Sequence, residues 1–381
     1  MAEEKEHSGK KALFCASAAS HIINFHNGYL ESLQRMGFEV HAAAGINAFD
    51  NSGLGLIRAQ KTFRLKFEKG KKFFLNIASA FGLAKIIRRE KYDIISTHSM
   101  LAGFVGRLAV LLSRRKNIKV MHTCHGYLFD GGGFMPKPKI LVEKFLAGCT
   151  DLLFVMNADD YKIAKKYKLC KRIEYTQGMG LSPEKLEAGA DPRQYSIPPG
   201  KKYILCVGEF SKRKNQKTVI LAFARFLRAL PKATGGGYHL VFLGGGALLS
   251  ECRRLCERLG ITANVSFAGY VGDVAAFYKY CSHLVVSASR FEGLPFNIME
   301  ALHYNKPVLA SNVKGHKDLI FDGFNGFLFD FGDSAALSAL FLKAFEPNTY
   351  ESLKSNAKLD EKYYFDNVKD KILNCYRDIL R

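Results

Sequence analysis

Residues 283–302 read HLVVSASRFEGLPFNIMEAL and describe a strand, a loop and a helix in succession. The run of Leu, Val and Val suits a strand that is buried on both faces of a parallel sheet. Pro295 suits the first turn of a helix, because a residue there needs no intrahelical N–H donor. Similar apolar runs alternate with helical stretches along the chain, which is the pattern of βαβ units. The sequence therefore predicts an α/β fold with parallel sheets.

This alternation occurs twice, and a segment without periodicity separates the two halves. A length of 381 residues suits two domains rather than one. The separating segment combines Pro, Gly and charged residues, which is typical of a linker. We therefore expect a doubly wound domain over 1–182, a linker over 183–200, a second such domain over 201–361, and a C-terminal helix over 362–381 that is able to pack back on the first domain.

Ten apolar runs are the expected strands. In open parallel sheets, ligands lie beyond the carboxyl ends of the strands. The chemistry is therefore expected in the strand-to-helix loops of both domains, which would face each other across an interdomain cleft. The runs are 12–18, 39–45, 92–98, 119–126 and 151–157 in the first half, and 203–210, 239–246, 265–270, 283–289 and 307–313 in the second.

The net charge of +21 is concentrated in the first half of the chain. Residues 51–150 hold 19 Lys and Arg against 5 Asp and Glu. Within them, residues 61–91 interleave basic and apolar residues at spacings that give a helix a basic flank beside an apolar face. Such a surface favours an anionic membrane or a polyphosphate. The alternative places four apolar side chains in the core, with a solvated basic face opposite: Phe73, Phe74, Ile77 and Phe81.

Several classes of protein do not fit the composition. No apolar run reaches the roughly 18 residues of a spanning helix, and the run over 101–112 is broken by Arg107. Residues 1–11 lack the apolar core of a secretory signal, and the nine cysteines include no CxxC. We therefore expect a cytoplasmic protein with reduced thiols, able to lie peripherally on the inner face of the cell membrane. No zinc-finger or RNP-like pattern is present, so nucleic acid is not an expected partner.

The loop before the predicted helix has the features of an anion site. The first-turn amides of Leu294, Phe296 and Asn297 point toward the loop, with the positive end of the helix dipole behind them. Glu292 precedes the helix and Glu300 lies about a turn and a half inside it, so the two carboxylates flank the anion site. This arrangement suits a sugar nucleotide, whose hydroxyls lie on both sides of its diphosphate. In the alternative, Glu292 caps the helix and Glu300 forms a surface ion pair.

A second loop carries cations and glycines at the ends of two other strands. Lys212, Arg213 and Lys214 follow the first strand of the second domain, where a diphosphate would need positive charge. The alternative is a solvated run of charges. Gly208, in VG, and Gly244, in GGG, would allow a base or ribose to approach the backbone, although GGG is also typical of a tight turn.

These residues resemble those of the retaining glycosyltransferases of family 4, which have the two-domain GT-B fold. Glu292 and Glu300, with seven residues between them, match the E-x7-E motif of that family. Residues 301–320 (ALHYNKPVLASNVKGHKDLI) and 323–329 (GFNGFLF) match its usual continuation. The resemblance covers most of the chain and is strongest over 203–330.

The resemblance implies a role for each matching residue. Glu300 would bind the donor ribose, and Glu292 would bind hydroxyls of the donor sugar near the reacting carbon. The amides that follow Gly293 would hold the diphosphate together with Lys214. His125, in TCHG, matches the active-site histidine near the donor sugar. The second domain would then bind the nucleotide sugar, and the first would be the acceptor side.

The chain departs from the family pattern at two loops. Glu209 stands where many relatives have Arg, so a second cation on the diphosphate is either missing or supplied by Arg213. Residues 17–28 (SAASHIINFHNG) lack the paired glycines that many relatives use to approach the donor phosphate. Ser17 in this loop, and His98 at a strand end in STHSM, are the predicted acceptor-side residues.

The sequence predicts transfer without a metal or other cofactor. There is no D-x-D motif, and His122 with Cys124 lack a third ligand, which favours core packing for both. Lys214 and the helix dipole would therefore stabilise the leaving diphosphate. In the mechanism that the resemblance implies, the acceptor hydroxyl attacks from the leaving-group face and the departing phosphate takes its proton.

The expected reaction moves a hexose or N-acetylhexosamine from a nucleotide diphosphate sugar, of which UDP-sugars are the first choice, to a glycan acceptor. A basic first domain suits an acceptor carried on a lipid diphosphate at an anionic membrane surface, as in the assembly of bacterial cell-surface polysaccharides. Two alternatives stay open: a nucleotide-sugar 2-epimerase of the same architecture, and a non-catalytic protein that binds polyanions.

Overall fold

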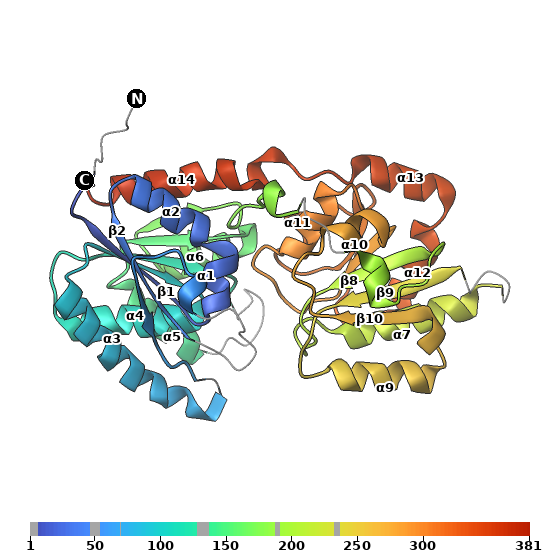
Figure 1. The fold of residues 1–381 in the computed structure, drawn as a ribbon, viewed down its shortest axis with the longest axis horizontal. Coiled ribbons are helices and arrows are strands. Elements are labelled where there is room, and N and C mark those ends of the chain that lie inside the picture. Colours follow the sequence, from blue (N-terminus) through green and yellow to red (C-terminus); the bar gives the residue numbers. More distant parts are fainter. Residues whose placement is uncertain (1–6, 46–53, 69, 128–136, 187–190, 232–236) are drawn as a thin grey trace. The chain divides into compact units, whose positions relative to one another are not determined.

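The computed structural model describes residues 7–381 except for 46–53, 69, 128–136, 187–190 and 232–236. The chain divides into two compact units (Figure 1). The first unit extends to Gly180 and also includes Asp366–Arg381, and the second is Leu181–Phe365. Each unit contains one parallel sheet with helices on both faces. This is the predicted doubly wound α/β architecture.

The first sheet has seven strands in the order β3-β2-β1-β4-β5-β6-β7. All its strand pairs are parallel. The order reverses between β1 and β4, which makes their carboxyl ends the switch point where ligands bind in such sheets. The strands are β1 (Lys11–Ala16), β2 (Glu39–Ala44), β3 (Lys61–Arg64), β4 (Ile94–His98), β5 (Lys119–Cys124), β6 (Leu152–Val155) and β7 (Arg172–Tyr175).

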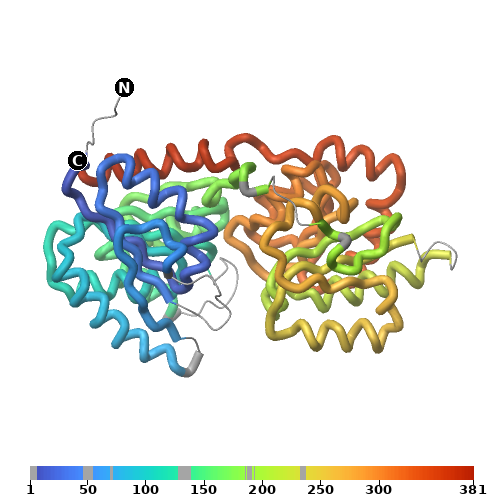
Figure 2. The backbone as a smooth tube through the Cα atoms, viewed as in Figure 1, coloured from blue at the N-terminus to red at the C-terminus, as the bar shows by residue number. Residues whose placement is uncertain are grey.

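Helices cover both faces of this sheet. One face carries α3 (Asn76–Glu90), α4 (Met100–Ser113), α5 (Lys137–Ala147) and α6 (Ala158–Tyr167). The other carries α1 (Ala19–Phe25), α2 (Asn27–Arg35) and α14 (Phe365–Asp378). The tube in Figure 2 shows α14, at the end of the chain, running beside these first helices. Its Tyr376 donates a 2.7 Å hydrogen bond to Ser96 of β4 and stacks on Phe14 of β1.

The basic and apolar stretch over 61–91 is not one helix. It forms β3, the short 3₁₀ helix η2 (Gly70–Leu75) and then α3. The helix prediction was wrong for 61–64, because these residues pair with β2 as an edge strand. The alternative that placed four apolar side chains in the core is wrong: the exposed fractions of Phe73, Phe74, Ile77 and Phe81 are 45, 64, 46 and 53%.

A buried ion pair joins two of the helices on this side. Arg107 of α4 donates through Nη2 to both carboxylate oxygens of Glu143 on α5, at 3.0 and 2.9 Å. Its Nε also donates to the Gly103 carbonyl oxygen. A buried charge must be paired and hydrogen-bonded, and these bonds pair the Arg107 guanidinium within an otherwise apolar helix. Among the described residues, no helix is long and apolar enough to cross a membrane.

The second sheet has six parallel strands in the order β10-β9-β8-β11-β12-β13. Its switch point lies between β8 and β11. The large apolar core of this unit lies on the face covered by α7 (Gln216–Ala229), α9 (Leu249–Leu259) and α12 (Ser334–Ala344). The strands are β8 (Lys202–Val207), β9 (Tyr238–Leu243), β10 (Val265–Gly269), β11 (Leu284–Ser287), β12 (Val308–Ser311) and β13 (Gly326–Phe329).

The opposite face of the second sheet carries α10 (Ala275–Tyr280) and α11 (Phe296–His303), the helix that contains Glu300 (Figure 1). α13 (Pro347–Asn356) packs against α12. The remaining short 3₁₀ helices are η1 (Leu54–Leu56), η3 (Pro183–Leu186), η4 (Pro192–Tyr195), η5 (Thr262–Asn264) and η6 (Glu361–Tyr363). Part of the expected linker, 187–190, lies outside the described residues.

Candidate functional site

The switch point of the second sheet brings together the two loops that carry the predicted donor residues. One loop follows β8 and the other follows β11, and these strands are neighbours. The Arg290 backbone N–H donates to the Arg213 carbonyl oxygen at 2.8 Å. The Asn297 side chain, on α11, donates to the Val207 carbonyl oxygen at 3.2 Å. These bonds hold the end of β8, the loop after it and the start of α11 in one local structure.

Three predicted residues meet at this point. Glu292 Oε1 lies 2.7 Å from Arg213 Nη1 and 2.7 Å from Lys214 Nζ. The Glu292 side chain is 10% exposed and that of Lys214 is 15% exposed. Burial alone would raise the pKa of Glu292, but Lys214 and Arg213 lower it to about 2. Lys214 is therefore not a solvated charge, and Glu292 is an anion at neutral pH.

Glu300 has the opposite electrostatic environment. Burial raises its pKa to about 7, and only the Tyr278 hydroxyl and the charge of Lys214 act in the other direction. Tyr278, on α10, donates to Glu300 Oε2 at 2.9 Å and lies 3.0 Å from the Asn297 carbonyl oxygen. The pKa of Glu300 is therefore well above that of Glu292, so Glu300 binds a proton much more readily. Glu300 is partly exposed, but its carboxylate accepts this bond from Tyr278, and it forms no ion pair among the described residues.

The start of α11 differs slightly from the expectation. The helix begins at Phe296, and Pro295 is its N-cap residue with extended backbone, not its first helical residue. Pro295 makes no side-chain cap bond, and the Glu292 carboxylate contacts Arg213 and Lys214. Leu294, Phe296 and Asn297 lie at this end of the helix, as predicted. Their role in holding an anion stays a prediction.

Two glycines shape the loops beside Lys214. Gly244 has a φ of +134°, and a Cβ there would collide with the Gly208 carbonyl oxygen. Gly208 has a φ of +154°, and its own Cβ would lie 3.3 Å from two carbons of the Lys214 side chain. Gln216 closes the turn, donating to the Glu209 carbonyl oxygen at 2.9 Å. Both glycines are therefore required where backbone and the Lys214 stem approach closely.

The sequence interpretation missed His316, as it missed Tyr278. His316 is fully buried; its Nε2 lies 3.2 Å from Ser287 Oγ, and its Nδ1 lies 2.9 Å from the Ser311 carbonyl oxygen. Burial lowers its pKa to about 4, although the Glu292 charge opposes that shift. His316 therefore bridges the ends of β11 and β12 as a neutral imidazole. His316 lies within the stretch 301–320 that matches the family, but a single His in a loop does not by itself indicate a functional role.

The switch point of the first sheet holds the predicted acceptor-side residues. Ser17, after β1, lies 3.3 Å from Ser99, after β4, between their hydroxyl oxygens. His98 at the end of β4 stacks on Phe14 and lies 3.1 Å from the Ser96 hydroxyl through Nε2. Its exposed fraction is 2%. Ser17 is the more accessible of the two predicted residues.

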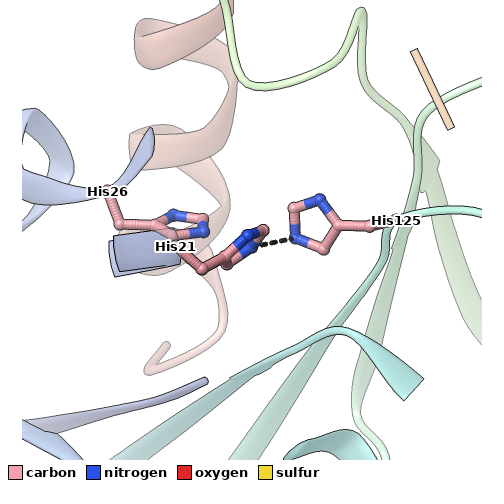
Figure 3. Close-up of side chains that lie close together, drawn as sticks. All are labelled: His21, His26 and His125. Atoms are coloured by element: carbon pink, nitrogen blue, oxygen red, sulfur yellow. Dashed lines mark hydrogen bonds between the residues drawn. The ribbon is translucent and has the colours of Figure 1, made fainter. Parts of the chain in front are cut away.

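His125 has histidine neighbours that the sequence interpretation did not connect with it. Its Nε2 lies 3.2 Å from the Nε2 of His21, and His26 packs against His21 (Figure 3). Burial lowers the pKa of His21 to about 4 and the pKa of His125 well below its usual range. The carboxyl ends of parallel strands meet at one edge of the sheet, and this rule could have grouped these histidines. Residues 17–28 follow β1, and His125 follows β5.

His122 and Cys124 pack in the core, as predicted. His122 is fully buried, and its Nδ1 lies 2.9 Å from the Thr97 hydroxyl. Cys124 belongs to the apolar cluster between the sheet and α5 and α6.

Comparisons with known proteins agree with this geometry. Residues 188–360 match the family described as glycosyl transferases group 1, and residues 29–175 match glycosyltransferase family 4. EpsD of Bacillus subtilis, a protein assigned as a glycosyltransferase, is 32% identical over 338 residues that cover 86% of each chain. The Escherichia coli UDP-Gal:α-D-GlcNAc-diphosphoundecaprenol α-1,3-galactosyltransferase is 25% identical over 327 residues, covering 80% of each chain.

Solved structures share the fold at low sequence identity. Anabaena HepE, solved in complex with UDP and glucose, superposes with a TM-score of 0.76 at 17% identity and covers 97% of this chain and 100% of its own. Sucrose-phosphate synthase from Thermosynechococcus elongatus gives a TM-score of 0.77 at 19% identity, with 97 and 99% covered. The fold class is therefore GT-B, and the sequence matches favour glycosyl transfer over epimerisation and over non-catalytic polyanion binding. Together they show that the chain belongs to glycosyltransferase family 4, a family of retaining glycosyltransferases.

Proposed function

We propose that this enzyme transfers a hexose or N-acetylhexosamine from a UDP-sugar to a glycan acceptor carried on a lipid diphosphate, in the synthesis of a cell-surface polysaccharide. The observation that carries the proposal is the contact of Glu292 with Arg213 and Lys214 at the switch point of the second sheet. Two cations beside a helix start suit a diphosphate, and an ionised acid beside them suits sugar hydroxyls.

The donor base and sugar are inferred from relatives. The E. coli relative is named for a UDP-galactose donor, and the HepE structure contains UDP. In our assignment, Lys214, Arg213 and the amides of Leu294, Phe296 and Asn297 hold the diphosphate. Glu300 accepts hydrogen bonds from the ribose. Gly208, Gly244 and Gly293 provide the close backbone approach that a nucleotide needs.

The proposed mechanism uses no metal or cofactor. The bond between the anomeric carbon and the phosphate oxygen breaks, and its electron pair leaves with the diphosphate. Lys214 offsets the negative charge that grows there, and preorganised charges of this kind are typically the largest contribution to catalysis. The acceptor oxygen bonds to the anomeric carbon on the same face, and its proton passes to the departing phosphate. We assign to His125 the orientation of the donor sugar, and to Ser17 and His98 contacts on the acceptor side.

The acceptor is inferred from the first unit and from one relative. The E. coli relative is named for an acceptor on diphosphoundecaprenol, which is a lipid diphosphate. In this chain, η2, α3 and α5 expose large apolar side chains next to basic ones, and α3 and α5 both pack against α4. We call this the apolar–basic surface and propose that it rests on an anionic membrane. Its exposed members are Lys72, Phe73, Phe74, Ile77, Phe81, Lys85, Arg88, Arg89, Leu141, Lys144 and Phe145.

A transfer assay tests the proposed function. The purified full chain is incubated with UDP-glucose, UDP-galactose or UDP-N-acetylglucosamine and with a sugar linked to a polyprenyl diphosphate in anionic vesicles. We expect one donor to be consumed only when acceptor is present, with a longer lipid-linked glycan as product. Conversion of UDP-N-acetylglucosamine without acceptor would instead identify an epimerase, and failure to bind any UDP-sugar would refute the donor assignment.

A matched pair of variants tests the role of Lys214. Lys214→Met removes the ammonium but keeps the apolar stem, and we expect UDP affinity to fall about tenfold to a hundredfold, since a hydrogen bond to a charged group contributes about 1.5–3 kcal/mol. Lys212→Met is the control, because Lys212 is exposed in the same loop. Equal losses in both variants would show that only general positive charge matters.

A further inference from the structure

Four histidines gather at the carboxyl ends of β1, β4 and β5. The ring centroids of His21 and His125 are 4.4 Å apart, those of His21 and His26 are 5.1 Å apart, and those of His26 and His98 are 3.9 Å apart. Figure 3 shows the His21 ring between His26 and His125. The rings come from the α1–α2 region, from the end of β4 and from the loop after β5, so the fold itself brings them together.

The ligand atoms of three of these rings have spacings close to those of a metal site. One ring nitrogen from each of His21, His26 and His125 can be chosen so that all lie within 4.8 Å of one another. The His21 and His125 Nε2 atoms are 3.2 Å apart. Two nitrogens bound to one tetrahedral Zn²⁺ at about 2.0–2.1 Å would be about 3.3–3.4 Å apart. That pair already has nearly the required spacing, and metal binding would have to draw the three nitrogens closer together than 4.8 Å.

The chemistry of the rings also favours a cation. His26 is fully buried, and neither of its ring nitrogens has a hydrogen-bond partner among the described residues. Leaving such a group unpaired costs about 1–3 kcal/mol. Each of the three imidazoles can offer one ring-nitrogen lone pair to a cation. Neutral imidazoles bind metals and do not attract anions.

We propose that His21, His26 and His125 form a binding site for one borderline transition-metal ion, of which Zn²⁺ is the best fit. Three imidazoles suit Zn²⁺, Cu²⁺ or Ni²⁺ rather than Mg²⁺ or Ca²⁺, which prefer oxygen. His21 and His125 are partly exposed, which gives the ion a path from solvent, and His26 lies at the buried end. The site does not use the donor residues of the second unit. A bound Zn²⁺ would engage the His125 lone pair, which the proposed function uses to orient the donor sugar. We therefore expect Zn²⁺ to inhibit transfer.

Direct metal binding tests the inference without depending on activity. The full chain, with any affinity tag removed, is titrated with Zn²⁺ by calorimetry and with Co²⁺ by absorption spectroscopy. We expect one equivalent to bind, with the visible bands of tetrahedral Co²⁺. His26→Gln and His21→Gln should each weaken Zn²⁺ binding at least about tenfold. His21 is partly exposed, so its variant is informative even if His26→Gln is poorly folded.

The control is His303→Gln, which changes a histidine of the second unit that bonds to Tyr364. It should leave the metal affinity within about twofold. Absence of stoichiometric binding to the wild-type chain, or full affinity in folded His21→Gln, would overturn the inference. Neither result would bear on the proposed glycosyl transfer, which is measured with UDP-sugar and acceptor in the presence of a chelator.

Discussion

Glu292 and Lys214 are in direct contact, with 2.7 Å between Oε1 and Nζ. The same carboxylate oxygen lies 2.7 Å from Arg213 Nη1, so one anion neutralises two cations. If these cations bind the donor diphosphate, the ligand must share them with Glu292 or displace it. The carboxylate is then a competitor of the diphosphate as well as a partner of the sugar.

Glu292→Gln should therefore separate binding from turnover. Removing the competing charge is expected to tighten UDP binding about threefold to tenfold, a gain of about 0.7–1.4 kcal/mol. Turnover should fall at least about a hundredfold, because the neutral amide replaces the ionised carboxylate that accepts hydrogen bonds from the sugar. Calorimetry with UDP and steady-state kinetics with the donor measure the two effects.

Glu209→Gln is the matched control for that variant, because Glu209 is an exposed acid in the same loop. It should change neither quantity by more than about twofold. Weaker UDP binding by Glu292→Gln would mean that Glu292 holds the cations in position for the diphosphate and does not compete with it.

Glu300 predicts a pH dependence of donor binding. Burial raises its pKa to about 7, so the group gains its charge as the pH rises through that value. A carboxylate accepts ribose hydroxyls better than a neutral acid does, and UDP affinity should therefore increase between about pH 6 and 8. Calorimetry across that range tests this, and Glu300→Gln should give a flat profile. Tyr278→Phe removes a bond that lowers the pKa and should shift the rise to higher pH.

The same shift has a consequence for folding. A carboxyl whose pKa is higher in the folded state than in the unfolded state favours folding when it is protonated. Its contribution is fully present below the ordinary value near 4.5 and is lost as the pH rises through about 7. Glu300→Gln should thus flatten the thermal stability between pH 5 and 8 relative to the wild type. A wild-type stability curve with no slope attributable to Glu300 would contradict the raised pKa.

The sequence was most informative where one strand–loop–helix unit carries the chemistry. The apolar runs predicted the central strands, and the motif around Glu292 and Glu300 predicted which loop matters. The edge strands β3, β7 and β13 were missed. β3 is four residues long and lies at the edge of the sheet, and none of its residues is fully buried. Its mixed Lys, Thr, Phe and Arg composition therefore carries no strand pattern.

Contacts between distant residues were beyond the sequence. Nothing in the spacing of Tyr278 and Glu300 indicates that a hydroxyl reaches the acid, because they lie on different helices that the fold brings together. His21 and His125 are 104 positions apart and meet only because β1 and β5 end at the same edge of the sheet. In the sequence, Arg107 only interrupts an apolar run, and nothing there identifies Glu143 as its partner.

Two adjacent glycines give a sharp test of the loop geometry near Lys214. Gly244→Ala would place a methyl group against the Gly208 carbonyl oxygen at a φ of +134°, whereas a Cβ at Gly245 meets nothing within 4 Å. We expect Gly244→Ala to destabilise the fold by more than about 1–3 kcal/mol, the usual cost of backbone strain, and to abolish UDP binding. Gly245→Ala should behave like the wild type in thermal unfolding and in calorimetry. Equal behaviour of the two variants would contradict the close approach.

The apolar–basic surface predicts that vesicle binding has two separable components. Phe74 and Phe81 are 64 and 53% exposed, so Phe74→Ser with Phe81→Ser removes apolar contact with the lipid. Lys85→Glu with Arg88→Glu removes the attraction to anionic headgroups, which is about 1 kcal/mol for each basic residue near the surface. Each double variant should weaken binding to anionic vesicles about tenfold or more in a sedimentation assay. Only the first should retain the salt dependence of the wild type, because salt screens the charges and not the apolar contact.

Tyr280→Ser provides the control for these variants, because Tyr280 is 70% exposed but belongs to the second unit. It should bind vesicles as the wild type does. If both double variants also bind like the wild type, the surface does not contact the membrane. A lipid-linked acceptor would then have to be reached through other residues, and the exposed aromatic side chains of η2 and α3 would need a different partner. Loss of binding only in the charge variant would instead identify a purely electrostatic contact, with Phe74 and Phe81 above the lipid.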